Sequence, residues 1–139
     1  MCTPQTDFGA SRFEQRHDMT ADTSTPLFSA PEQLARRPYS VSVDVWAYGC
    51  CIACLFCNVQ SPYETGAGGG VADAGDDFLI RVERGQLVPV LDPRHGPPDA
   101  VRIVETCCRH SESERPAITA VMSMLHDGVG EPKQPGVEQ

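Results

Sequence analysis

The chain has 139 residues, a formal net charge of -8 and a pI of about 4.8. This length suits one compact domain, because a chain of this size can bury enough apolar surface to form its own core. The acidic balance argues against nucleic acid as a partner, because binding a phosphate backbone needs a basic face.

Nothing in the sequence predicts a secretory signal or a membrane segment. The first residues are polar, and the most apolar stretch, 48–56, is too short to cross a bilayer. The seven cysteines, with no secretory signal, are typical of reduced thiols, and an odd number fits a closed disulfide framework poorly. We therefore expect an intracellular, cytoplasmic protein without a membrane partner.

The spacing of apolar residues predicts a mainly α-helical fold with almost no strand. Residues 10–29 carry no clear period and are expected to form a loop. Helices are expected over residues 30–37, 41–57, 76–85, 100–108 and 116–125. Their expected first residues or caps are Ser29, Ser42 and Pro116, because Ser accepts hydrogen bonds from free helix N–H groups and Pro fits the first turn.

The segment 41–57 is the strongest helix candidate and is apolar on nearly every side, which predicts a buried central helix. Its apolar stripe is expected to be Val45, Tyr48, Ile52, Leu55 and Phe56. The last two helices have the stripes Val101, Val104 and Cys108, and Ile118, Val121, Met122 and Leu125. The glycine-rich stretch 64–75 predicts a linker, and residues 127–139 predict a disordered tail.

Four short motifs follow one another along the chain: Asp7-Phe8-Gly9, Ala30-Pro31-Glu32, Asp44-Val45-Trp46-Ala47-Tyr48-Gly49 and Arg115-Pro116. In this order they resemble the C-terminal lobe of a protein kinase domain, with a layout most similar to tyrosine-kinase-like Ser/Thr kinases. The resemblance covers residues 7–126 and leaves 1–6 as a non-matching leader. It implies an activation segment over 7–32 and a helical subdomain over 33–126.

The resemblance implies roles for residues of the activation segment. Asp7 would hold the Mg²⁺ that bridges the phosphates of ATP, with Phe8 as an apolar contact and Gly9 allowing the backbone to turn. Thr25 stands at the position that marks Ser/Thr-directed kinases. The hydroxyl residues that precede it are candidate sites of regulatory phosphorylation: Thr20, Thr23 and Ser24.

The resemblance also implies structural roles in the helical subdomain. Ala30 and Pro31 lead into Glu32, which is expected to form a buried ion pair with Arg115. The other structural positions are Asp44, Trp46 and Gly49. Asp44 would receive hydrogen bonds from the catalytic loop. Cys108 and Glu112 stand where Trp and Pro are common, which predicts loosened packing.

Several parts of a kinase have no counterpart in these residues: the glycine-rich nucleotide loop with its Lys, and the His-Arg-Asp catalytic loop. We therefore expect a truncated domain without N-lobe or catalytic loop, which binds neither Mg²⁺ nor ATP and is inactive alone. The full-length form would phosphorylate protein substrates with ATP. The alternative is a pseudokinase-like, non-catalytic lobe that binds a protein partner.

Three other patterns could suggest a phosphate or metal site, and we interpret none of them as one. The run Gly66–Gly70 lacks the Gly-Lys-Ser/Thr of a phosphate loop. Cys51, Cys54 and Cys57 have the spacing of cluster ligands, but they lie in an apolar helix and are expected to pack as small hydrophobes. The histidines have no metal-ligand spacing and are expected at the surface or in loops: His17, His95, His110 and His126.

Overall fold

The computed structural model describes residues 26–59, 61–63 and 76–128, and the ordered elements in these ranges are helices. In chain order they are η1 (Pro26–Phe28), α1 (Pro31–Leu34), α2 (Ser42–Cys57), α3 (Asp76–Glu83), α4 (Pro98–Cys107), η2 (Glu112–Glu114) and α5 (Ile118–Gly128). The mainly α-helical class predicted from the sequence is confirmed.

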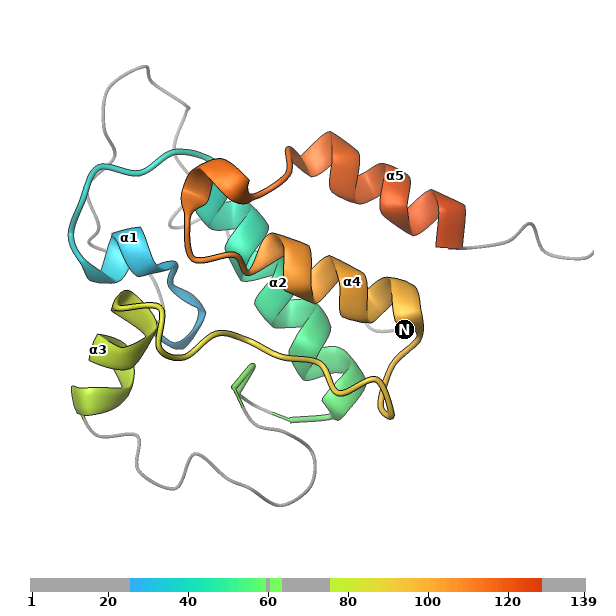
Figure 1. Cartoon of the computed structure of the whole chain (residues 1–139), viewed down its shortest axis with the longest axis horizontal. Coiled ribbons are helices and arrows are strands. Elements are labelled where there is room, and N and C mark those ends of the chain that lie inside the picture. Colours follow the sequence, from blue (N-terminus) through green and yellow to red (C-terminus); the bar gives the residue numbers. More distant parts are fainter. Residues whose placement is uncertain (1–25, 60, 64–75, 129–139) are drawn as a thin grey trace, which may run out of the picture.

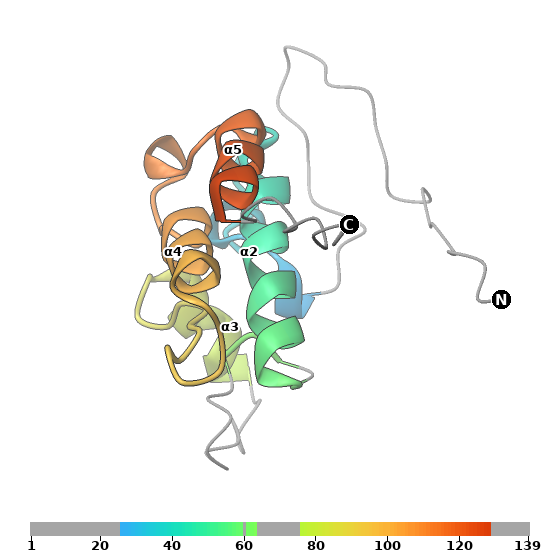
Figure 2. The same cartoon turned by 90° about the vertical axis from the view of Figure 1, so that its right-hand side faces the viewer.

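Helix α2 is the element around which the others are arranged (Figure 1). It packs along α4, and α4 in turn contacts α5. Figure 2 shows α2 and α4 side by side, with α5 beside their upper ends. The short helices α1 and α3 contact each other on the other side of α2, and η1 also touches α2.

The buried side chains form two groups that share α2 and α4. The larger group joins α2 to α3, α4 and the loops, and its α2 members are Val43, Trp46, Cys50 and Ala53. The smaller group lies between α2, α4 and α5 and consists of Val45, Ile103, Cys107 and Val121. Because α2 contributes to both groups, its position decides where the other helices can lie.

The face of α2 that is buried differs from the predicted stripe. Within that stripe Val45 is buried and Tyr48 and Ile52 are partly buried, but Leu55 is 72% exposed and Phe56 is also exposed. The prediction was wrong at the C-terminal half of the helix. Since α2 is apolar on nearly every side, periodicity could not show which side the other helices cover.

The stripe predicted for α5 is also wrong at most positions. Val121 is buried, but Ile118, Met122 and Leu125 are exposed. Helix α5 contacts α4 along one side only, so a single row of its side chains enters the core. In α4 the predicted residues Val104 and Cys108 are buried.

Helix α1 is shorter than the predicted range 30–37 and is capped by Ala30, one residue after the predicted Ser29. It ends because Arg36 takes a left-handed conformation, with φ of 52°. The amide of Arg37 then donates to the carbonyl of Glu32, which closes the helix as many C-terminal caps do. A non-glycine residue in this conformation was not foreseeable from the sequence pattern.

Three other helices also have ends that differ from their predicted positions. Ser42 is the first residue of α2 and not its cap, and its amide donates to Ser40 Oγ instead. Helix α4 begins at Pro98, before the predicted start at residue 100. Helix α5 begins at Ile118, after Pro116, and extends through Gly128 into the range predicted to be a tail.

The loosened packing predicted at Cys108 is not found. Cys108 is buried, and its Sγ lies 2.5 Å from the point where a Cβ on Gly49 would be. Cys107 Cβ lies 2.9 Å from the same point. The absence of a side chain at Gly49 therefore lets the end of α4 approach the backbone of α2.

Among the described residues, no helix combines the length and the apolar character needed to cross a membrane.

Replacing Gly49 with Ala is expected to destabilise the fold by about 1–3 kcal/mol, because the new methyl group overlaps Cys108 Sγ. Helix propensity alone would give the opposite sign, since Ala is favoured over Gly by about 1 kcal/mol. Urea unfolding followed by circular dichroism measures the difference. Cys51→Ala, at an exposed position of the same helix, is the control. A Gly49→Ala variant as stable as the parent would contradict the close approach.

Candidate functional site

Glu32 and Arg115 form a buried ion pair between α1 and the segment that precedes α5. The two terminal nitrogens of the Arg115 guanidinium each donate to one oxygen of the Glu32 carboxylate: Nη1 lies 2.5 Å from Oε1, and Nη2 lies 2.8 Å from Oε2. The Arg115 side chain is 0% exposed, and the Glu32 side chain is 4% exposed. This parallel geometry suits Arg, whose planar fork matches the two carboxylate oxygens. The pairing expected from the resemblance is thus present.

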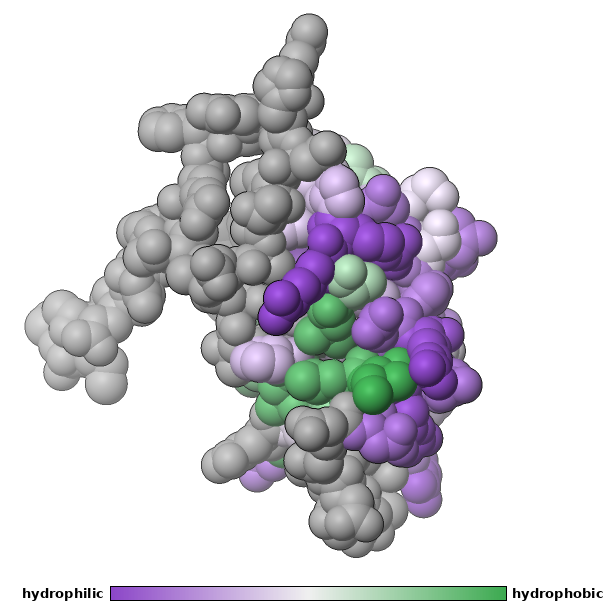
Figure 3. Space-filling model, turned by 90° about the vertical axis from the view of Figure 1, so that its left-hand side faces the viewer, coloured by the Kyte–Doolittle hydropathy of each residue, from purple (hydrophilic) through white to green (hydrophobic). Residues whose placement is uncertain are grey.

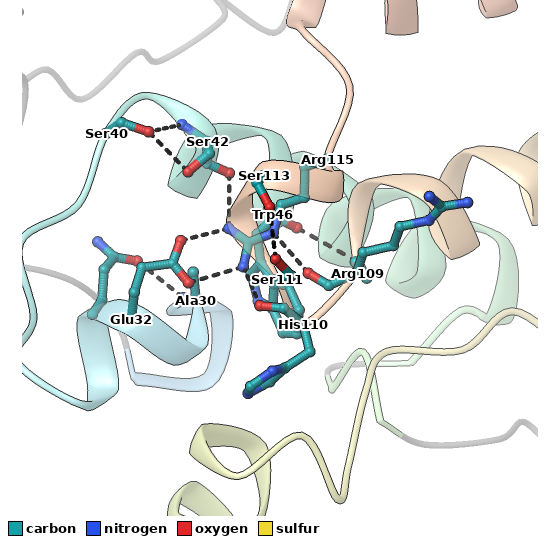
Figure 4. A network of polar contacts seen from close by, with 12 residues as sticks. Ala30, Glu32, Ser40, Ser42, Trp46, Arg109, His110, Ser111, Ser113 and Arg115 are labelled. Atoms are coloured by element: carbon teal, nitrogen blue, oxygen red, sulfur yellow. Dashed lines mark hydrogen bonds and ion pairs between the residues drawn. The ribbon is translucent and has the colours of Figure 1, made fainter.

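Arg115 also binds three backbone carbonyl groups from two other places in the chain (Figure 4). Its Nε donates to the Arg109 carbonyl at 2.8 Å, and Nη2 donates to that of His110 at 3.1 Å. Nη1 donates to the Ser42 carbonyl, at the start of α2, at 3.2 Å. Every N–H group of the guanidinium therefore has a partner, so burying its charge leaves no donor unsatisfied.

The ring of Trp46 packs against the Arg115 guanidinium. Its side chain is 0% exposed, and the Arg115 guanidinium carbon lies 5.1 Å from the centre of its ring. A cation at this distance over an indole is attracted by the ring's negative face. Trp46 thus joins the ion pair to the core of α2.

The indole Nε1 of Trp46 is buried, and it has no hydrogen-bond partner of normal geometry among the described residues. Tyr63 is the polar group that lies nearby. Burial raises the pKa of its hydroxyl well above the usual range, and the contact with Trp46 opposes that rise.

Ala30, Pro31 and Glu32 are all buried where α1 begins. Pro31 is the first residue of the helix, where its missing N–H costs nothing and its fixed φ is already helical. The Ala30 amide donates to Gln33 Oε1 at 3.0 Å, which is half of a capping box. These contacts fix the direction in which Glu32 points. The sequence analysis missed Gln33, although its position three residues after the cap was a usable signal.

The remaining predicted residues do not all join this network. Gly49 lies at the close approach of α2 and α4, and Asp44 is exposed in the first turn of α2. The predicted activation-segment residues lie outside the described residues: Asp7, Phe8, Gly9, Thr20, Thr23, Ser24 and Thr25. The predicted ion-binding and phosphorylation sites therefore remain predictions.

The described residues contain no group of three or more His, Cys, Asp or Glu side chains arranged to hold a metal ion. The cysteines Cys51, Cys54 and Cys57 lie in α2, and Cys51 is exposed. The predicted Mg²⁺ ligand, Asp7, is outside the described ranges. What this site can do chemically is to hold the residues around Glu32 in a fixed place against the helices.

The sequence analysis missed a polar contact between the loop after α4 and helix α3. The Nε2 atom of His110 lies 2.8 Å from the Glu83 carbonyl, at the end of α3. Its ring covers Gly85, which has φ of +70° and no room for a Cβ. His110 is exposed, as predicted, but its carbonyl also accepts from Arg115, so it connects α3 to the ion pair.

Removing one partner of the ion pair is expected to cost about 3–5 kcal/mol, because the other charge would remain buried and unpaired. We expect this loss in both Glu32→Ala and Arg115→Ala, measured as the free energy of unfolding in urea. Arg115→Lys is expected to be nearly as harmful, because Lys keeps the charge but cannot reach three carbonyls and a carboxylate together.

The pair between Asp92 and Arg94 supplies a matched control. It has similar short contacts, but the Arg94 side chain is 75% exposed. Removing either partner there is expected to leave the unfolding midpoint nearly unchanged. If Glu32→Ala and Asp92→Ala shifted the midpoint equally, the burial argument would fail.

Comparison with known proteins shows similarity to protein kinases across most of the chain. The mouse serine/threonine-protein kinase Nek4 is 27% identical over 120 residues, which is 84% of this chain and 14% of the relative. Human protein-tyrosine kinase 6 is 29% identical over 121 residues, 86% of this chain and 25% of the relative. Rat ephrin type-A receptor 6 is 28% identical over 124 residues, 86% of this chain and 11% of the relative.

These relatives include a serine/threonine kinase and a tyrosine kinase by name, and the chain spans only 11% to 25% of their length. A family model described as the protein kinase domain matches residues 5–126. This range contains the ion pair, Trp46 and all the described helices except the end of α5, after residue 126. The chain therefore belongs to the protein kinase domain family.

Proposed function

We propose that this chain is the activation-segment and helical part of a Ser/Thr protein kinase domain, which transfers the γ-phosphate of ATP to protein hydroxyl groups when the catalytic loop is present. The observation that supports it best is the buried pair of Glu32 and Arg115 over Trp46. It fastens the end of the activation segment to the helical lobe, which is the positioning that phosphoryl transfer needs.

The choice of Ser and Thr over Tyr rests on Thr25, directly before η1. By resemblance, its hydroxyl would bond the catalytic Asp of the whole domain. Residues 26–32 are held by the contacts of η1 and α1. Asp7 would hold Mg²⁺, which when bound would neutralise charge on the phosphates of ATP. We propose that these 139 residues position the end of the activation segment and do not by themselves transfer phosphate from ATP.

An expression product that joins these residues to the upstream part of the full-length form, with its glycine-rich loop, Lys and His-Arg-Asp-x-x-x-x-Asn catalytic loop, tests the proposal. We expect it to transfer phosphate from Mg·ATP to Ser and Thr of a mixed protein substrate, detected by phosphoamino-acid analysis. The 139 residues alone are expected to give no transfer above background. Phosphotyrosine as the main product would contradict the Ser/Thr assignment.

Thr25→Ala in that longer protein is expected to lower the rate at least tenfold, and Thr25→Ser to restore most of it. Ser113→Ala, at an exposed position of η2, is the control and should leave the rate unchanged. Equal rates for Thr25→Ala and Ser113→Ala would rule out a positioning role for Thr25.

A non-catalytic lobe that binds a protein partner is the second candidate, and exposed apolar surface favours it. On the side of the molecule that carries α1 and α3, hydrophobic side chains form a band bordered by hydrophilic ones (Figure 3). Elsewhere Leu55 of α2 and Met122 of α5 are largely exposed. Exposed apolar groups of this kind often mark protein interaction sites. A longer protein that neither binds ATP nor transfers phosphate would favour this candidate.

A further inference from the structure

Two buried thiols from different elements meet where α2 passes the end of α4. Cys50, in the middle of α2, is 0% exposed, and Cys108, directly after α4, is also buried. The Cys108 Sγ contacts the Trp46 carbonyl at 3.8 Å and lies against the backbone of Gly49. The Cys108 thiol therefore sits on the turn of α2 that precedes Cys50.

Helix geometry brings the Cys50 side chain to the same turn. Side chains on an α-helix lean toward its N-terminus, so Cys50 leans over the carbonyl of Trp46, four residues earlier. This is the carbonyl that Cys108 Sγ contacts. Both thiols belong to the same buried cluster, and the neighbouring Cys50 thiol together with burial raises the pKa of Cys108.

We propose that Cys50 and Cys108 are an oxidisable dithiol pair that closes to a disulfide between α2 and the end of α4. With hydrogen peroxide as the oxidant, one thiol sulfur takes an oxygen atom as the O–O bond breaks, and the first water leaves. The second thiol sulfur then attacks the resulting sulfenic sulfur. The S–S bond forms and the sulfenic oxygen leaves as the second water, carrying the second thiol proton. Two thiols thus lose two electrons and two protons to one peroxide.

Burial makes this a slow reaction and also makes it selective. Both thiols are buried, so reaction requires a local opening of the end of α4 away from α2. Cys51 is exposed and therefore meets the oxidant first. To pair with Cys108, however, it would have to reach the buried face of α2, which its neighbour Cys50 occupies. Cys107 belongs to the buried group with α5, and it also lies against Gly49. Consecutive Cα atoms are about 3.8 Å apart, closer than the roughly 4.4–6.8 Å that a disulfide usually spans, so Cys107 is a poor partner for its neighbour Cys108. Geometry therefore favours Cys50 as the partner of Cys108.

The disulfide would act on the ion-pair network, because Cys108 begins the loop that carries Arg115. That loop supplies the carbonyls of Arg109 and His110 to the guanidinium, and the new bond would tie its first residue to α2. The cross-link closes a long loop of chain, which restricts the unfolded state. Oxidation is thus expected to raise the unfolding temperature by at least about 5 °C, and a thiol reductant is expected to reverse the rise.

The 139-residue chain treated with one equivalent of hydrogen peroxide, then with N-ethylmaleimide, tests the proposal by mass spectrometry. We expect a monomer that has lost two alkylation sites, with a peptide cross-link whose fragment ions join Cys50 to Cys108. Because the fragment ions assign the pairing in the parent chain, the result does not depend on how well any variant folds.

Cys50→Ala and Cys108→Ala are each expected to abolish the cross-link, and Cys51→Ala, at an exposed site, is expected to keep it. The proposal is overturned if the fragment ions place the cross-link at Cys51 or Cys107, if cross-links form only between two chains, or if the cysteines oxidise to sulfinic acids without an internal cross-link.

Discussion

The buried pair of Glu32 and Arg115 is the interaction on which the rest of this structure depends. Moving each ion out of water costs several kcal/mol, and mutual attraction offsets that cost only when the remaining donors are also satisfied. Here they are, because the carbonyls of Ser42, Arg109 and His110 complete the shell of the guanidinium. The fold must therefore bring α1, the start of α2 and the loop after α4 to one point.

That requirement connects parts of the chain that are far apart in sequence. Glu32 and Arg115 are 83 residues apart, and the packed pair of α2 and α4 lies between them in the chain. The pair can form only when α2 and α4 have packed, since Trp46 and the loop after α4 form its surroundings. The same loop begins at Cys108, which lies against Gly49. Close packing of two helices and burial of two charges are thus parts of one arrangement.

The sequence was most informative where short-range chemistry decides the outcome. Helix α3 lies within its predicted range, because acids at its start and Gly85 after its end act locally. The partner of Glu32 was predictable only through the resemblance to kinases, since nothing in the spacing of Glu32 and Arg115 indicates contact. The three carbonyls that complete the shell were not predictable, because backbone groups leave no signal in a sequence.

The errors have a common physical cause, which is that packing between helices decides which side chains are buried. Leu55 and Met122 fit apolar stripes, yet both are exposed, because the neighbouring helices cover other sides of α2 and α5. Cys108 was expected to loosen the packing because it is smaller than Trp, but Gly49 lets it approach the helix backbone. The effect of Cys108 on packing depends on Gly49, which it contacts, and the sequence alone did not identify that contact.

Hydrogen exchange of the amides in α1 tests most directly whether the ion pair fastens this segment to the lobe. A helix of four residues has little stability of its own, so the amides of Ala35 and Arg37 should be protected only through Glu32. We predict that they exchange within about tenfold of the core amide of Cys108, and that Arg115→Lys removes their protection first. If they exchange as fast as free peptide in the parent chain, or equally in both proteins, the ion pair does not hold the segment.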